Sequence, residues 1–295
     1  MTDKQNSPTR ARLSISAATT YEASFDEDLV AYADAEVGGI GIWEYKLGKG
    51  DDAAIDALAK SSLTATVCVP LVPGLYPDRL FPEPTTPQDR RRAMVEGIKR
   101  LAQFEPQACL FLANIHEGVD PREARPVVID GLKAAAETAG ELGISLALEP
   151  LRAELGTLAV TPSDGVELIE EADVSNVGLL LDTWHFWDLP NIEEELVRHV
   201  SKVLAVQING RAPNPRSWCD RLLPGEGVIK LAETVALLER IGYDGWYDVE
   251  IFSDNGQFGD MWPDSLWALG AGDLAARTAK GFRRAWEVAM ESNAN

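Results

Sequence analysis

The sequence predicts an α/β fold, a single closed (β/α)8 barrel. Three observations lead to this fold class. Eight short apolar or β-branched runs recur along the 295 residues, an amphipathic segment follows each run, and no shift in composition marks a linker or a second domain. Nearly continuous apolar runs are typical of parallel strands covered on both faces, and parallel strands need crossovers between them. A doubly wound open sheet is the alternative arrangement of the same elements.

The apolar runs predict eight strands, four in each half of the chain. They lie at 12–17, 38–44, 63–69, 109–113, 145–150, 177–182, 203–209 and 246–252. The amphipathic segments predict helices at 25–36, 51–61, 87–104, 121–142, 163–172, 191–200, 229–242 and 265–290. Several begin at a capping residue such as Asn191, and several end at a glycine such as Gly143 or Gly242. The strict alternation favours the barrel.

The predicted barrel takes up almost the whole chain. An α/β barrel commonly needs roughly 250 residues, so we expect one domain over residues 11–291. The first ten residues are polar, which predicts a disordered segment over 1–10, and the tail 291–295 has the same character. The first residues lack the apolar centre of a signal peptide, and no apolar run approaches the roughly 18 residues of a membrane span. These features predict a cytoplasmic protein without membrane contact.

The charge balance excludes one class of partner. The chain carries 47 acidic and 27 basic side chains, which gives a formal charge of −20. Nucleic acids and anionic membranes are bound mainly through Lys and Arg, so neither is an expected partner. Three cysteines and three histidines are too few and too scattered to predict a disulfide framework or a thiolate metal site. A metal site in this chain must therefore rely on carboxylates.

Oxygen donors stand at the ends of four consecutive predicted strands. Active sites of α/β barrels lie at the carboxyl ends of the strands. These donors are Glu149, Asp182, Gln207 and Glu250. A carboxylate in an apolar strand is costly unless it is paired, hydrogen-bonded or metal-bound, and bonding to a loop amide or an arginine is the alternative for each one. Three carboxylates and one amide oxygen predict one divalent ion, Mn²⁺ first, with Mg²⁺, Co²⁺ or Zn²⁺ as alternatives.

The motifs around these donors carry a resemblance to a known family. ALEPL, LDTWH, VQIN, RLLPGEG and GYDGWYDVEIFS resemble the xylose isomerase-like TIM-barrel superfamily of sugar phosphate isomerases and epimerases, densely in the second half of the chain. The resemblance implies that Glu149, Asp182, Gln207 and Glu250 are metal ligands. It implies that His185 contacts the substrate or supports the ligands. Ketose 3-epimerases usually have His at position 207, so Gln207 resembles the hydroxypyruvate isomerase and dehydratase branches more.

The resemblance and the donor set predict an enzyme. We expect a metal-dependent isomerase or epimerase that removes a proton α to the carbonyl of a small polyhydroxylated ketone, through a metal-stabilised enediolate. Glu149 and Glu250 are the predicted acid and base, and His185 competes for the proton-transfer role because its intrinsic pKa lies near neutrality.

Three other functions are alternatives to this one. A lyase acting on an inosose, a dehydroshikimate-like acid or a 3-oxo-glycoside shares the first step and is the main alternative. A non-catalytic barrel subunit is another. The apurinic-site endonucleases of the superfamily need a histidine-rich trinuclear zinc site, which the low histidine content and the charge of −20 argue against.

Further residues are predicted around this site. His116 follows the fourth strand, Trp184 belongs to LDTWH, and Arg221 lies in the loop after strand seven; all three are candidate substrate contacts. A surface role for His116, core packing for Trp184 and a salt bridge of Arg221 with Asp220 or Glu226 are the alternatives. The proline-rich segment 71–88 predicts either a lid or a rigid loop. An apolar last helix with Trp286 predicts a possible homo-oligomer.

Overall fold

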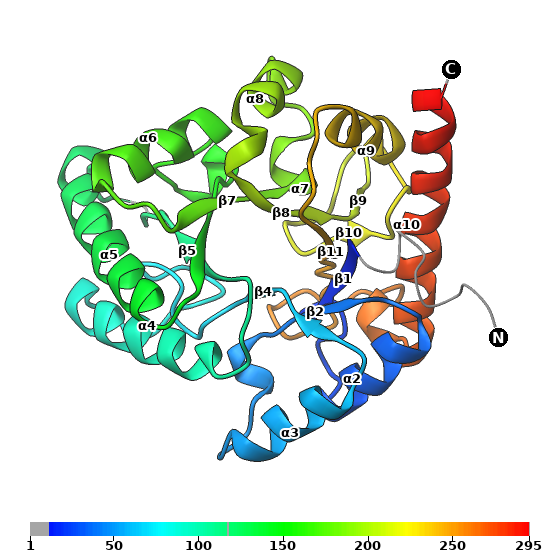
Figure 1. Ribbon diagram of the computed structural model, residues 1–295, viewed down its shortest axis with the longest axis horizontal. Helices are drawn as coiled ribbons and strands as arrows, with labels where there is room; N and C mark the ends of the chain where they lie inside the picture. Colours follow the sequence, from blue (N-terminus) through cyan, green and yellow to red (C-terminus); the bar gives the residue numbers. More distant parts are fainter. Residues whose placement is uncertain (1–11, 117, 295) are drawn as a thin grey trace. The chain divides into compact units, whose positions relative to one another are not determined.

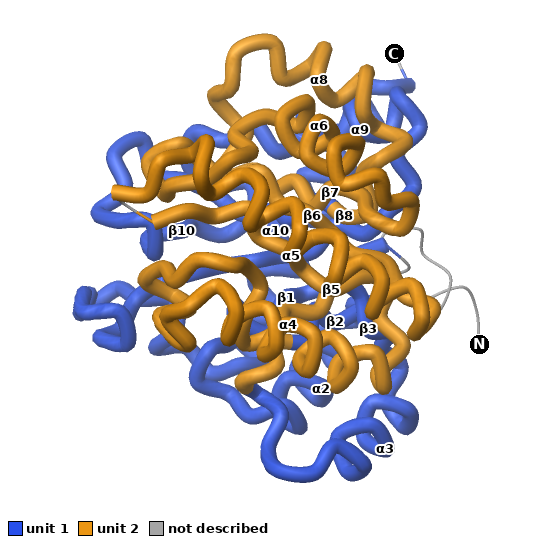
Figure 2. The backbone as a smooth tube through the Cα atoms, turned by 90° about the vertical axis from the view of Figure 1, so that its left-hand side faces the viewer, with its two compact units in different colours: residues 1–42, 46–66, 206–295 blue, residues 43–45, 67–205 orange. Residues whose placement is uncertain are grey.

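The computed structural model describes residues 12–116 and 118–294, which form two compact units. Unit 1 contains residues 12–42, 46–66 and 206–294, and unit 2 contains residues 43–45, 67–116 and 118–205 (Figure 2). The predicted disordered segment 1–10 lies outside the described residues. No helix among the described residues is long and apolar enough to cross a membrane.

Unit 1 is built on a parallel sheet in the order β3-β2-β1-β11. Its strands and helices are β1 (Leu13–Ser16), α2 (Phe25–Asp34), β2 (Gly39–Gly41), α3 (Asp52–Lys60), β3 (Thr64–Ala65), α9 (Leu231–Arg240), β11 (Trp246–Val249) and α10 (Ala271–Ala294). The short antiparallel pair β9 (Gly210–Arg211) and β10 (Arg221–Leu222) was not predicted. The last residues of β8 (Val203–Ile208) lie beside β11, because the amide of Glu250 donates to the carbonyl of Ile208 at 3.1 Å.

Unit 2 continues the same alternation with a parallel sheet in the order β7-β6-β5-β4. Its elements are β4 (Val67–Cys68), α4 (Pro87–Ala102), β5 (Ala108–Leu112), α5 (Pro121–Glu141), β6 (Ser145–Glu149), α6 (Pro162–Ala172), β7 (Val177–Asp182), α7 (Thr183–Phe186) and α8 (Ile192–His199). Helices α4, α5 and α6 flank its strands (Figure 1). The strands are buried on both faces, as their continuous apolar character predicts.

Three predicted element boundaries were wrong. The run at 63–69 is divided into β3, which pairs with β2, and β4, which pairs with β5. The last helix begins at Ala271, after a separate turn at Leu266–Ala268. Its end extends to Ala294, within the tail that was predicted to be disordered, and Asn293 donates to the carbonyl of Ala236. The single domain over 11–291 stays a prediction.

The core of unit 1 fills with side chains from β11 and α10. The ring of Tyr247 lies 5.2 Å from Phe282 and 5.8 Å from Trp286, between ring centroids. The guanidinium of Arg12 lies over the Tyr247 ring and forms an ion pair with Glu239. Trp286 is only 9% exposed in the single chain, so it is packed within unit 1. The expected oligomer interface therefore gains no support from this residue.

Candidate active site

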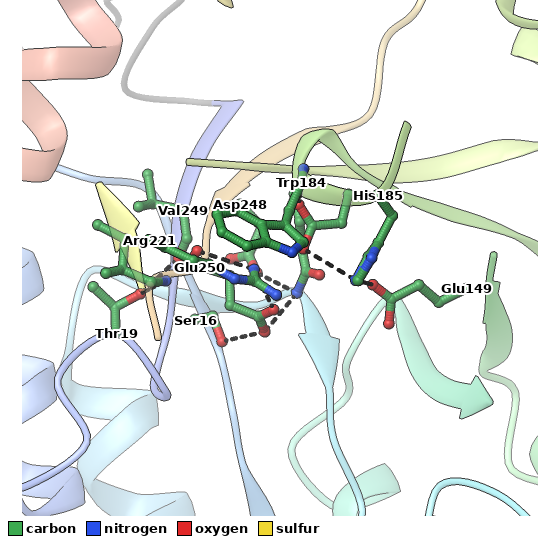
Figure 3. A network of polar contacts seen from close by, with 12 residues as sticks. Ser16, Thr19, Glu149, Trp184, His185, Arg221, Asp248, Val249 and Glu250 are labelled. Carbon is green, nitrogen blue, oxygen red and sulfur yellow. Dashed lines mark hydrogen bonds and ion pairs between the residues drawn. The ribbon is translucent and has the colours of Figure 1, made fainter. Parts of the chain in front are cut away.

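Three buried side chains meet at the ends of β6 and β7 in unit 2. Glu149 is the last residue of β6, Asp182 is the last residue of β7, and His185 lies on α7. Nε2 of His185 lies 3.7 Å from Oε1 of Glu149 and 3.9 Å from Oδ2 of Asp182 (Figure 3 shows His185 facing Glu149). One potential ligand atom from each residue falls within 4.8 Å of the others. Two predicted ligands and the predicted neighbouring histidine thus lie together.

A helix cap explains why His185 returns to Asp182. Asp182 is the N-cap of α7, and its Oδ1 accepts a hydrogen bond from the amide of Trp184 at 2.8 Å. An N-cap aspartate turns the chain from strand into helix and satisfies an amide that would otherwise lack a partner. Residues i and i+3 of a helical turn lie on one side. The Asp-x-x-His spacing in LDTWH therefore brings both side chains to one point.

The hydrogen bond to Nδ1 of His185 defines the role of its ring. The backbone amide of Arg152 donates to Nδ1 at 3.4 Å, so the neutral ring carries its proton on Nε2. Histidines that bind a metal normally donate a hydrogen bond through their other nitrogen, whereas Nδ1 here accepts one. Nε2 can then donate toward the two carboxylates. This arrangement favours His185 as a proton donor beside the ligands over His185 as a ligand.

The side chain of Arg152 ties together the two segments that carry this cluster. Its guanidinium binds Asp188 through two hydrogen bonds of 2.7 and 3.3 Å and binds Glu154 at 2.6 Å. Burial works against ionisation of Glu154, but the hydrogen bond and charge of Arg152, a backbone hydrogen bond and the nearby His185 together outweigh it and lower the pKa of Glu154. Arg152 follows β6 and Asp188 follows α7, so the ion pair keeps the amide of Arg152 beside the His185 ring.

The other two predicted ligands belong to a polar cluster of unit 1. Nε2 of Gln207 donates to Oε1 of Glu250 at 2.9 Å, and Oγ of Ser16 donates to the same oxygen at 3.2 Å. Arg221 donates through Nη1 to Oε2 of Glu250 at 3.2 Å (Figure 3). Arg221 thus pairs with Glu250, whereas Asp220 pairs with Arg216. The salt bridge of Arg221 with Asp220 or Glu226, the alternative to a substrate contact, stays a prediction.

The donor atoms of this cluster fit a divalent cation. Oε1 of Gln207 is buried and accepts no hydrogen bond from the described residues, an uncommon state for a buried amide oxygen. The carboxylate of Glu250 accepts hydrogen bonds from the side chains of Ser16, Gln207 and Arg221. Carboxylate and amide oxygens suit Mn²⁺ or Mg²⁺. The four-ligand set of Glu149, Asp182, Gln207 and Glu250 nevertheless stays a prediction.

Two polar residues of unit 1 were missed by the sequence prediction. Ser16 ends β1, and Asp248 lies two residues before Glu250 on β11; both are 1% exposed or less. Residues i and i+2 of a strand point to the same face, so Asp248 shares the face of Glu250. The alternation in WYDVE was therefore a signal that Asp248 also points inward.

Comparison with known proteins identifies the family. The family described as xylose isomerase-like TIM barrel matches residues 31–282. The chain belongs to the xylose isomerase-like TIM-barrel family. This membership confirms the predicted barrel, and the doubly wound alternative was wrong.

Individual members of the xylose isomerase-like family match parts of the chain. An inosose isomerase of Halalkalibacterium halodurans is 28% identical over 44% of this chain and 47% of its own length. An inosose dehydratase of Geobacillus thermodenitrificans is 27% identical over 43% of this chain and 47% of its own length. The chain thus spans about half the length of these relatives. The crystal structure of the IolI protein with a bound zinc atom has a TM-score of 0.75 at 19% identity, covering 93% of this chain and 97% of IolI, and shows the same fold.

The remaining predicted contacts of this xylose isomerase-like chain lie in unit 2. His116 is exposed, and its ring lies edge-on to Tyr76 at 5.8 Å between centroids. Trp184 is only 3% exposed, which favours packing over substrate contact. Both assignments stay predictions. Segment 71–88 is held from inside by Arg90, which is fully buried and donates to the carbonyls of Gly74 and Phe81. These bonds favour the rigid loop over the lid.

Proposed function

We propose that the protein is a divalent-metal-dependent isomerase or epimerase of a small polyhydroxylated ketone. The observation that carries the proposal is the buried cluster of Glu149, Asp182 and His185, whose ligand atoms lie within 4.8 Å of one another at the ends of two strands. Buried carboxylates this close repel each other, and a cation offsets the repulsion. The isomerase relative and the zinc-bearing structure of the same fold support this choice.

The proposed ligands are those expected from the sequence, Glu149 and Asp182 from unit 2 and Gln207 and Glu250 from unit 1. A bound divalent cation would polarise the substrate carbonyl and stabilise the negative charge that develops when the neighbouring carbon loses its proton. Mn²⁺ is the proposed ion because three of the four ligands are carboxylates.

The protein's own side chains supply the proton transfers. Glu149 or Glu250 accepts the proton from the carbon next to the carbonyl, and the other returns a proton on the neighbouring position or the opposite face. His185 carries its proton on Nε2, 3.7 Å from Glu149, and can give it up during this exchange. Arg221 orients Glu250 through its Nη1 and, in this proposal, binds a substrate hydroxyl.

A lyase that acts on an inosose, a dehydroshikimate-like acid or a 3-oxo-glycoside is the second candidate. The dehydratase among the relatives favours it, and it begins with the same proton abstraction. The two reactions differ in the fate of the intermediate. An isomerase returns a proton to carbon, whereas a lyase expels a group from the next carbon.

Turnover in D₂O separates these reactions. The purified full chain with Mn²⁺ is screened against keto-sugars, inososes and 3-oxo-glycosides, and products are weighed by mass spectrometry. An isomerase gives a product that is heavier only by deuterium, and a lyase gives one lighter by its leaving group. Glu149→Gln should abolish turnover and Mn²⁺ binding, whereas the exposed Glu193→Gln should change neither. Absence of Mn²⁺ binding by the unaltered protein would reject the proposal and favour a non-catalytic subunit.

A further inference from the structure

The amide of Gln207 is held in one orientation by two carboxylates of unit 1. Its Nε2 donates to Oε1 of Glu250 at 2.9 Å and to Oδ2 of Asp248 at 3.5 Å. A primary amide has one donor end and one acceptor end, so fixing Nε2 also fixes the direction of Oε1. The side chain is only 2% exposed, and Oε1 accepts no hydrogen bond from the described residues. The oxygen is thus presented to a ligand.

Glu250 alone is poorly suited to fix the orientation of the Gln207 amide. Its two carboxylate oxygens already accept hydrogen bonds from Ser16 and Arg221, and as a metal ligand it would also face the cation. Asp248 has none of these tasks in the proposed reaction. It lies within β11, and it is 1% exposed. Its Oδ2 accepts a hydrogen bond from Gln207, and Asp248 is not a proposed metal ligand.

We propose that Asp248 is a positioning residue that holds Nε2 of Gln207 so that Oε1 meets the divalent cation. This inference rests on the proposed function. Burying a carboxylate costs folding free energy, and the proposed role of Asp248 is to orient the Gln207 amide. Partners that orient metal ligands commonly contribute 10- to 100-fold in metal affinity. Without Asp248 the amide can rotate and present its NH₂ end, which repels a cation.

A double-mutant cycle on metal affinity tests this role. The dissociation constant for Mn²⁺ is measured by the electron paramagnetic resonance of free Mn²⁺ for the full chain, Asp248→Ala, Gln207→Ala and the double variant. We expect about a tenfold loss for Asp248→Ala and no further loss when it is added to Gln207→Ala. The inference would be overturned if Asp248→Ala weakened Mn²⁺ binding equally with and without Gln207→Ala. It would also be overturned if Asp248→Ala alone caused no loss of Mn²⁺ affinity.

Two more variants keep the test decisive. Asp248→Leu removes the acceptor while keeping the branched shape of the side chain, and it replaces Asp248→Ala in the cycle if the alanine variant does not fold. Glu239→Gln alters another acid of unit 1, which pairs with Arg12 and Tyr247, and should leave Mn²⁺ affinity unchanged. If Glu149→Gln weakens Mn²⁺ binding but the cycle is additive, only this inference fails. If the unaltered protein binds no Mn²⁺, the proposed function fails with it.

Discussion

At the scale of single residues, the protonated nitrogen of His185 decides between two kinds of site. A histidine ligand would shift the donor set toward the nitrogen-containing sites preferred by Zn²⁺. The amide of Arg152 donates to Nδ1 and leaves the proton on Nε2, toward Glu149. This hydrogen bond favours the predicted proton-transfer role of His185, whereas its distances to the carboxylates alone would also allow it to be a ligand.

Replacing His185 separates these two roles. We expect His185→Asn to lower kcat by about 100-fold, the lower end of what a positioned acid or base contributes, and to change the Mn²⁺ dissociation constant by less than about threefold. Steady-state kinetics with the substrate found in the screen and Mn²⁺ titration of the same preparation provide both values. Glu149→Gln is the reference variant because it should lose both properties. A loss of Mn²⁺ affinity as large as that of Glu149→Gln would make His185 a ligand.

At the scale of elements, segment 71–88 is fixed by a buried arginine of α4. The guanidinium of Arg90 donates to the carbonyls of Gly74, Phe81 and Pro84 at 2.7 to 3.0 Å. Asp78 accepts hydrogen bonds from the amides of Leu80 and Phe81, and burial raises its pKa. A proline-rich loop has few backbone donors of its own, so one arginine satisfies carbonyls that would otherwise be buried without partners.

Removing this arginine should destabilise unit 2. We expect Arg90→Met to lower the free energy of unfolding by about 3 kcal/mol, because three carbonyls lose a charged donor. Urea denaturation followed by circular dichroism measures the loss. Arg92→Met changes an exposed arginine of the same helix and should stay within about 0.5 kcal/mol of the unaltered protein. Equal stability of the two variants would show that Arg90 does not hold the segment.

Elements with a strong local signal could be predicted from the sequence. β6 and β7 are continuous apolar runs that end in a carboxylate, so their positions and the candidate ligands at their ends could be predicted from the sequence. The four-residue α7 could not be predicted, because it depends on the cap formed by Asp182. The division of 63–69 into β3 and β4 depends on which neighbouring strand each half pairs with. Local patterns do not contain that information.

Contacts between distant side chains were the least predictable part of the site. The strand-end position of Gln207 indicated a ligand, but the bond from its Nε2 to Asp248 joins residues 41 positions apart. Arg221 was expected near the substrate, and its pairing with Glu250 is equally long-range. The types of residue at strand ends were thus predictable, whereas their partners required the fold.

At the scale of the whole molecule, the charge of −20 complicates any test of metal binding. An excess of negative charge destabilises the folded chain through self-repulsion, so every cation stabilises it by screening. Surface acids are partly paired, as Glu167 and Glu171 are with Arg125, and such exposed pairs contribute little. Screening depends on ionic strength, whereas binding at a specific site saturates near its dissociation constant.

This difference gives the last prediction. At 100 times its dissociation constant, Mn²⁺ should raise the free energy of unfolding by about 2.7 kcal/mol, because it binds the folded chain and not the unfolded one. NaCl at the same ionic strength should give only the smaller screening effect. Glu149→Gln should keep the NaCl effect and lose the additional increase with Mn²⁺, both measured by urea denaturation. If Mn²⁺ stabilises Glu149→Gln as much as the unaltered protein, the stabilisation comes from the general charge and not from the ends of β6 and β7.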